Sequence, residues 1–373
     1  MFKTPWIALA APLLLSSLAC GDSDGRTSAY GSGVTLGSDE FGSNDGVDSN
    51  DGNDGIGTSG GDDSDPTDSG GIKLDTLGGD EDGRTSAGNE GGGAQGCQAI
   101  DFLFVIDNSG SMGNKQANLL ASFQPFMTKI QQTVVDVDSY HIMVVKTDEF
   151  WSGCDPIQCG FFPQLCQFGD INACTQSAPS VCDDTLGAGV NYPIGTGASN
   201  QYCELVGGQR YITPAEPFLA LPGRFSCIAN VGTSGSGAER QAESLIAALQ
   251  PAINGPGGCN SGFLRDDAVL VVTLITDEED SYSPGTANSW YEAVLARKGG
   301  DPTSIVMLGL INDTDAAVPI CPAGSDDPVK LREFIQKFPN TISGSVCADN
   351  YASFFEQAVD LIDTTCDMFE PIG

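Results

Sequence analysis

Three groups of oxygen-bearing side chains have the composition of a metal site. They are Asp107 with Ser109 and Ser111; Thr233, in the glycine-rich stretch 231–238; and Asp277, followed by Glu278, Glu279 and Asp280. Hydroxyl and carboxylate oxygens, without sulfur or imidazole, suit a hard divalent cation such as Mg²⁺, Mn²⁺ or Ca²⁺. The residue types therefore predict that one of these ions is the cofactor, provided that the fold brings the three groups together.

The elements that must position these groups are short apolar runs alternating with helix-like segments. The runs span 101–107, 141–148, 268–277 and 304–313. Because they are apolar on both faces, they predict strands of a central, mainly parallel sheet covered by helices. Apolar residues at helical spacing predict helices at 114–134, 239–249, 290–297, 329–338 and 351–362. This alternation predicts a doubly wound α/β fold, whose ligands lie beyond the carboxyl ends of the strands.

Each group taken alone also has a simpler interpretation. Serine and threonine suit helix N-caps and turns, and Asp277 suits a turn or a cap. The acidic run behind Asp277 fits a solvated loop equally well. The three groups together favour the metal site, because each stands beside the expected carboxyl end of a strand or the start of a helix.

The order of these motifs resembles that of the von Willebrand factor type A (vWA) domain, over roughly 101–366. The similarity rests on Asp-x-Ser-x-Ser at 107–111, a Gly-Thr loop at 232–233 with alanine five residues beyond the threonine, and Ile-Thr-Asp at 275–277. It implies a vWA/Rossmann-like fold with a metal-ion-dependent adhesion site (MIDAS), in which a carboxylate of a protein partner takes one coordination position. The ligands that the resemblance implies are the hydroxyls of Ser109, Ser111 and Thr233, and the carboxylates of Asp107 and Asp277, direct or through water.

The acidic run departs from this family, which commonly has glycine after the third-motif aspartate. Glu278, Glu279 and Asp280 are therefore candidates for additional metal ligands. Extra carboxylates would raise the metal affinity, shift the preference toward Ca²⁺, or fill the position meant for the partner, and they would repel an acidic partner. These alternatives stay open at the level of sequence.

A cysteine-rich insertion interrupts the predicted domain at about 150–229. It holds seven cysteines, and loops of this length are rare unless they are functional or disordered. The cysteine density favours an ordered excursion. Because it lies between the strand that ends near Thr147 and the Thr233 loop, we expect it to overhang the metal edge and to shape partner recognition. The alternative is a stabilising cap without a partner.

The chain has 13 cysteines. If Cys20 is the lipidated residue of a signal segment, as proposed below, twelve remain, which is enough for six disulfides. Seven is an odd number, so at least one cysteine of the insertion must pair with a cysteine outside it. The expected outside partner is Cys259, and Cys227 is a candidate for the insertion cysteine that it binds. Some vWA proteins join their domain ends, which implies a Cys97–Cys366 bond here. Cys321 and Cys347 are then left to pair with each other.

The first 96 residues predict export and tethering. Residues 1–20 contain one early lysine and an apolar run of 13 residues, too short to span a bilayer. The end of this segment resembles a bacterial lipoprotein signal with Cys20 as the lipidated residue; the alternative is an ordinary signal peptide. Residues 21–96 carry 17 acidic and three basic residues among many glycines, which predicts a disordered acidic Gly/Ser/Asp linker before a domain at 97–373. The expected location is the bacterial cell envelope, at the outer membrane or cell surface.

Charge and composition restrict the function. A net charge of −34 argues against nucleic acid and against anionic lipid surfaces, so the only expected membrane contact is the lipid anchor. The single histidine, His141, argues against histidine-based catalysis. We expect a surface-anchored, metal-dependent adhesion or protein-binding module rather than an enzyme. The alternatives are a calcium-stabilised structural component of an envelope assembly and, less favoured, a metal-dependent hydrolase.

Overall fold

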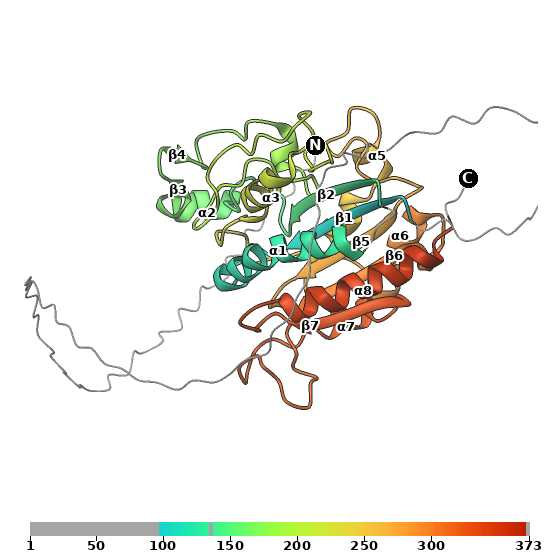
Figure 1. The fold of residues 1–373 in the computed structure, drawn as a ribbon. Coiled ribbons are helices and arrows are strands. Elements are labelled where there is room, and N and C mark those ends of the chain that lie inside the picture. Colours follow the sequence, from blue (N-terminus) through green and yellow to red (C-terminus); the bar gives the residue numbers. More distant parts are fainter. Residues whose placement is uncertain (1–96, 134–136, 371–373) are drawn as a thin grey trace, which may run out of the picture. The chain divides into compact units, whose positions relative to one another are not determined.

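The computed structural model describes residues 97–133 and 137–370, so the predicted signal segment, Cys20 and the linker lie outside the described residues. A five-stranded sheet forms the centre of the domain, with strand order β2-β1-β5-β6-β7 and every neighbouring pair parallel (Figure 1). Its strands are β1 (Ala99–Ile106), β2 (Ser139–Lys146), β5 (Val269–Ile275), β6 (Ile305–Ile311) and β7 (Asn340–Ser345).

The three central strands are buried along their whole length, as their uninterrupted apolar sequences predict. Side chains of β1 alternate between two cores: Phe102 and Phe104 enter one, Leu103 and Val105 the other. The edge strand β7 was not predicted, because its sequence NTISGS carries a single large apolar residue and is only half buried. A short edge strand needs no apolar run, since one side of it faces solvent.

Helices cover both faces of the sheet. One face packs against α1 (Gly113–Thr133), α3 (Leu221–Ala229) and α8 (Ala352–Met368), and the other packs against α4 (Gln241–Ala248), α6 (Ala287–Leu295) and α7 (Val329–Ile335) (Figure 1). The predicted doubly wound α/β fold is therefore confirmed. Shorter helical pieces are α5 (Pro251–Asn254) and the 3-10 turns η4 (Ala296–Lys298) and η5 (Pro302–Ser304).

Helix α3 lies within the range expected for the insertion, yet it belongs to the core. Phe225 is fully buried and stacks on Phe123 of α1, with ring centroids 3.5 Å apart. It also contacts Phe104 of β1 edge-on at 5.0 Å. The excursion outside the layers therefore ends before Leu221.

The rest of the insertion has little regular structure and is held by disulfides. It contains α2 (Pro156–Phe161), η1 (Pro163–Cys166), the two-stranded sheet β3 (Gln167–Phe168) and β4 (Ile171–Asn172), η2 (Val181–Asp184) and η3 (Phe218–Ala220). Trp151, Phe168 and Ile194 form a small core of their own. Farther along the insertion, Val190, Leu205 and Ile212 pack into the main core, so this packing and the disulfides together hold the insertion.

All twelve described cysteines are paired. The bonds are Cys97–Cys366, Cys154–Cys166, Cys159–Cys174, Cys182–Cys259, Cys203–Cys227 and Cys321–Cys347. As expected, Cys259 pairs with a cysteine of the insertion, which is Cys182. The candidate Cys227 instead pairs with Cys203, which also lies in the insertion. Cys227 is on α3, and the packing of this helix brings it to Cys203, a contact that cysteine spacing alone does not encode.

Within the described ranges, no helix is both long enough and apolar enough to cross a bilayer.

Candidate metal centre

The centre of the candidate site is the point where the strand order reverses. The chain leaves β1 and β5, which are neighbours in the sheet, toward opposite sides, and ligands of doubly wound folds bind at such a switch point. Asp107 follows β1, and its backbone N–H donates to the Ile275 carbonyl at the end of β5, 3.0 Å away. Asp277 follows β5 by two residues. The fold therefore sets the first and third motifs side by side.

Asp107 is fully buried and held in one orientation. Its Oδ1 accepts from the Ser109 backbone N–H at 2.7 Å, and its Oδ2 accepts from the Thr276 hydroxyl at 2.6 Å. Burial raises the pKa of Asp107 to about 6, despite these hydrogen bonds, and Asp277 adds repulsion. A carboxylate held away from water in this way favours a nearby cation.

The two serines connect Asp107 to Asp277. The hydroxyls of Ser109 and Ser111 lie 3.3 Å apart, and the Ser111 hydroxyl donates to Asp277 Oδ1 at 2.7 Å. Glu278 lies near them: burial, with repulsion from Asp107 and Asp277, raises the pKa of its carboxyl to about 7, and the Ser109 side chain lowers it. The structure thus brings together four of the five ligands implied by the vWA resemblance, together with Glu278.

Thr233 lies at the rim of this cluster. A methyl placed on Gly113 would lie 3.7 Å from Thr233 Cγ2, so the second motif faces the start of α1. The Thr233 hydroxyl donates to the Thr196 carbonyl at 3.2 Å, and its backbone N–H donates to the same oxygen at 2.8 Å. Its hydroxyl makes no hydrogen bond to the other candidate ligands, but its lone pairs stay available to a cation.

The other two candidates in the acidic run have structural roles. Glu279 accepts from the backbone N–H groups of Asp280 and Lys330, each at 2.8 Å. Asp280 is buried and accepts from the backbone N–H groups of Ala242 and Ser283, also at 2.8 Å. These are helix-capping and turn bonds, so Glu278 alone of the three faces the cluster.

Gln116 is a buried link between the first and second motifs that the sequence did not reveal. Its Nε2 donates to the carbonyls of Asp107 (3.1 Å) and Gly232 (2.8 Å), and its Oε1 accepts from the Gly232 N–H at 3.2 Å. The side chain sits on the buried face of α1. A glutamine at an apolar helix position is the one signal that could have marked it.

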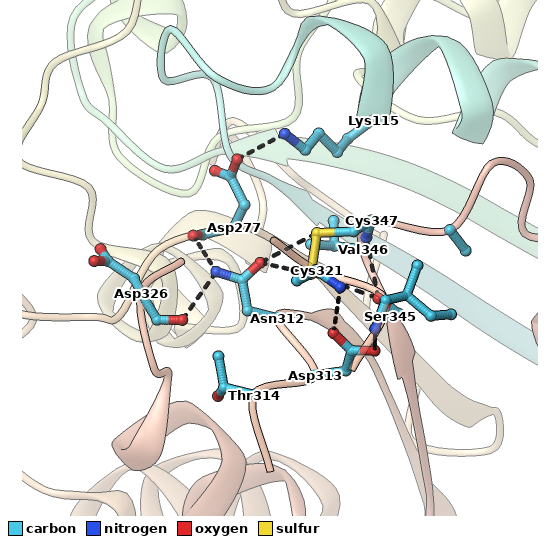
Figure 2. The surroundings of a disulfide bond; sticks show 12 residues. Lys115, Asp277, Asn312, Asp313, Thr314, Cys321, Asp326, Ser345, Val346 and Cys347 are labelled. Atoms are coloured by element: carbon cyan, nitrogen blue, oxygen red, sulfur yellow. Dashed lines mark hydrogen bonds and ion pairs between the residues drawn. A yellow bond between two sulfur atoms is a disulfide. The ribbon is translucent and has the colours of Figure 1, made fainter. Parts of the chain in front are cut away.

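Asn312 is a second such link, from the third motif to a disulfide. Its Nδ2 donates to the Asp277 carbonyl at 2.7 Å and to the Asp326 carbonyl at 3.0 Å. Its Oδ1 lies 3.2 Å from the Cys321 sulfur (Figure 2). The Cys321–Cys347 bond thereby supports the loop that carries Asp277.

Glu239 is a deeply buried acid near the site, with an unpaired carboxyl oxygen and a strongly raised pKa. It is 1 % exposed, its Oε1 has no hydrogen-bond partner, and its Oε2 contacts the Thr147 hydroxyl. Burial, together with repulsion from Asp107 and Asp148, raises its pKa to about 10. Glu239 is therefore protonated at neutral pH in the metal-free protein.

This protonation predicts a stabilising substitution. The folded chain holds a proton that the unfolded chain releases above about pH 4.5, so the unfolding free energy falls as pH rises. Glu239→Gln keeps the shape and removes this loss. In chelator, urea unfolding should show the variant about 5 kcal/mol more stable than wild type at pH 8 and equal to it at pH 4.5. Exposed Glu356→Gln is the control, and a gain independent of pH would contradict the assignment.

The insertion contacts the loop of the second motif, which carries Thr233. Gly195 and Thr196 contact Ser234, whose hydroxyl accepts from the Thr196 N–H at 2.6 Å. On the other side, a Cβ on Gly153 would lie 2.2 Å from the Ser234 carbonyl oxygen and 2.6 Å from Gly235 Cα. The expected overhang is therefore a direct contact with the loop that carries Thr233.

Gly153→Ala should separate the insertion from this loop. Gly153 and Gly169 both have positive φ (72° and 60°), but no atom lies within 4 Å of a Cβ on Gly169. Both alanines incur backbone strain of about 1 kcal/mol, and Gly153→Ala adds a clash of about 2 kcal/mol with the backbone. Urea unfolding should rank the variants accordingly, and equal losses would show that the contact is unimportant.

The donor set fits a hard divalent ion. Hydroxyl and carboxylate oxygens meet at one sheet edge, and burial, followed by repulsion between the acids, raises the pKa of Asp107 to about 6 and that of Glu278 to about 7. Soft-metal ligands are not free: in the described ranges, the cysteine sulfurs that gather within 4.8 Å, those of Cys159, Cys166 and Cys174, are already in disulfides. Among the described residues, no three carboxylates have oxygens within 4.8 Å of one another, so the candidate centre relies on hydroxyls together with the carboxylates, and Glu278 acts on it mainly through its charge.

No protein-family model matches this chain, and no curated protein sequence matches it. Among solved structures, proximal thread matrix protein 1 (PTMP1) from the mussel byssus is 10 % identical over 72 % of this chain and 49 % of that one, with a TM-score of 0.35. A structure of the same protein with a zinc-occupied MIDAS motif is 14 % identical, over 74 % and 47 %, with a TM-score of 0.34. The pilus adhesin SpaC from Lactobacillus rhamnosus GG, in an open conformation, is 12 % identical, over 72 % and 30 %, with a TM-score of 0.34. The chain therefore spans about half the length of the first two and under a third of the adhesin.

Proposed function

We propose that this chain is a divalent-metal-dependent protein-binding module that serves adhesion. The observation that carries the proposal is the cluster at the switch point, where buried Asp107 lies next to Ser109, Ser111 and Asp277. Mg²⁺ or Mn²⁺ is the expected ion, with Ca²⁺ favoured to the extent that Glu278 contributes a third carboxylate. The partner is a protein that offers an anionic oxygen.

The residues at the site have two kinds of role, binding the ion and positioning the loops that carry its ligands. Asp107, Ser109, Ser111, Thr233 and Asp277 would hold the ion, and Gln116 and Asn312 position the loops that carry them. A bound divalent ion supplies concentrated positive charge that attracts an anionic oxygen. Asp107 is buried and Ser111 is exposed, so the partner would approach from the side of Ser111.

The proposal is for an exported, non-catalytic protein. Six disulfides are typical of an oxidising compartment, and lipidation at Cys20 with a flexible tether would place the domain at the cell surface. His141 has a structural role: its Nδ1 lies 2.8 Å from the Phe263 carbonyl, and burial lowers its pKa to about 4. A neutral imidazole hydrogen-bonded in this way supports a module that binds rather than one that hydrolyses.

A calcium-stabilised structural component of the envelope is the second candidate. It is favoured by Glu278, which adds negative charge beside Ser109 and could satisfy the ion without any partner. In that case the ion would only hold the β1 and β5 ends together. The two candidates differ in whether metal is needed for capture or only for stability.

Titration calorimetry on the oxidised full chain, after chelation, tests both candidates with Mg²⁺, Mn²⁺ and Ca²⁺. One ion per chain, together with capture of a purified envelope protein that chelator reverses, supports the adhesion module. Binding that raises the thermal midpoint without any metal-dependent capture supports the structural component. A folded chain that binds none of the three ions rules out both.

A further inference from the structure

Lys115 places an ammonium group directly on the candidate metal centre. Its Nζ lies 2.8 Å from Asp277 Oδ2 and donates to the Ser111 carbonyl at 2.9 Å. The side chain is 14 % exposed and extends from the first turn of α1 toward Asp277 (Figure 2). A cation that pairs with a candidate metal ligand would oppose the binding of a divalent ion, so its presence requires an explanation.

The charges of the cluster provide one. Asp107, Asp277 and Glu278 together carry three negative charges when ionised, and a divalent ion neutralises two of them. The loaded centre would then be net negative and would repel the anionic oxygen that the proposed function requires. The single charge of Lys115 restores neutrality.

The geometry adds a second contribution. An ammonium group has three N–H donors, and the contacts to Asp277 and the Ser111 carbonyl use two of them. Among the described residues the third donor has no acceptor. Because the Lys115 side chain is 14 % exposed and contacts the carbonyl of exposed Ser111, this donor remains available to a partner that approaches from the side of Ser111.

We propose that Lys115 is a specificity-determining residue that lets the centre capture an acidic side chain of a protein despite Glu278. It offsets the third carboxylate, and it donates its third N–H to the carboxylate that arrives. This inference rests on the proposed function and names the chemistry of its partner. The charge-assisted bond and the restored neutrality should together change ligand affinity about tenfold.

The test uses the oxidised full chain and two probes. The first is Mn²⁺ alone, titrated by calorimetry. The second is a blocked pentapeptide, Gly-Gly-Glu-Gly-Gly, added to the Mn²⁺-loaded chain; broadening of its glutamate methylene resonances by the bound Mn²⁺ reports its affinity. The glutamine analogue of the peptide measures contact that does not depend on the carboxylate.

Lys115→Met should change the two affinities in opposite directions. Mn²⁺ should bind about tenfold more tightly because a repelling charge is gone, whereas the glutamate peptide should bind about tenfold more weakly. Lys115→Arg should restore the peptide affinity, and Lys129→Met, an exposed lysine on the same helix, should change neither. A purely structural lysine would weaken both affinities or neither.

The outcomes separate this inference from the proposed function. A folded wild-type chain that binds none of Mn²⁺, Mg²⁺ and Ca²⁺ defeats the proposed function. A wild-type chain that binds Mn²⁺ and the peptide, and a Lys115→Met variant that binds the peptide equally well, overturn the role of Lys115 alone. If Lys115→Met does not fold, Lys115→Gln keeps a donor for the Ser111 carbonyl without the charge, and the same opposite shifts are required of it.

Discussion

Asp107→Asn should lower the affinity for divalent ions at least about a hundredfold. Loss of groups that merely orient metal ligands typically costs 10- to 100-fold, and Asp107 is itself the buried carboxylate of the cluster. Asparagine keeps the size and one carbonyl oxygen but removes the charge. The fold should survive, because an amide at this site avoids the desolvation that raises the pKa of Asp107 to about 6.

Calorimetry with Mn²⁺ measures this loss, and urea unfolding in chelator tests the fold. The matched control is Asp349→Asn, which removes one exposed carboxylate elsewhere and should leave Mn²⁺ binding unchanged. A stable Asp107→Asn chain with wild-type metal affinity would falsify the site. An Asp107→Asn variant that loses Mn²⁺ binding and is also much less stable than wild type in chelator would assign Asp107 a structural role instead.

Removal of the Cys97–Cys366 bond is expected to have the largest effect on stability. The two residues are 269 positions apart in sequence, and both are buried. The loop-entropy relation gives a loss of about 5 kcal/mol for so long a loop, because the unfolded chain regains most of its freedom. The Cys97→Ala/Cys366→Ala variant should therefore unfold at a much lower urea concentration.

The control is a short loop in the same chain. Cys159 and Cys174 are 15 positions apart, so their replacement by alanine should cost at most about 3 kcal/mol. Equal losses from the two double variants would show that loop length does not set the stabilisation. Loss of the backbone bond from the Cys97 N–H to the Cys366 carbonyl, seen by amide exchange, would show that the domain ends separate.

Fold class was predictable because the central strands are apolar on both faces. A run such as that of β5, buried at all seven positions, fits a covered parallel sheet and little else. β7 and α3 were missed for the opposite reason. β7 lies at an edge and needs few apolar residues, and α3 is a short helix within a cysteine-rich stretch that hides its periodicity.

The candidate site was only partly readable. Asp107, Ser109, Ser111 and Asp277 were named from their places after predicted strands, and the structure places them within one hydrogen-bonded chain. The acidic run could not be resolved by sequence, because four consecutive carboxylates look alike. Only the fold shows that Glu278 faces the cluster while Glu279 and Asp280 bind backbone N–H groups of α7 and α4.

By itself, the sequence of this protein determined the layered α/β architecture and the sheet edge at which its oxygen ligands gather. Both follow from local patterns, because an uninterrupted run of apolar residues indicates a strand buried on both faces, and the polar residues that follow it indicate where the strand ends. The tertiary structure alone decided which cysteines pair, which acid joins the cluster, and that Lys115 contacts Asp277, 162 positions away. Such contacts depend on how distant segments pack, and a single sequence carries no local signal for them.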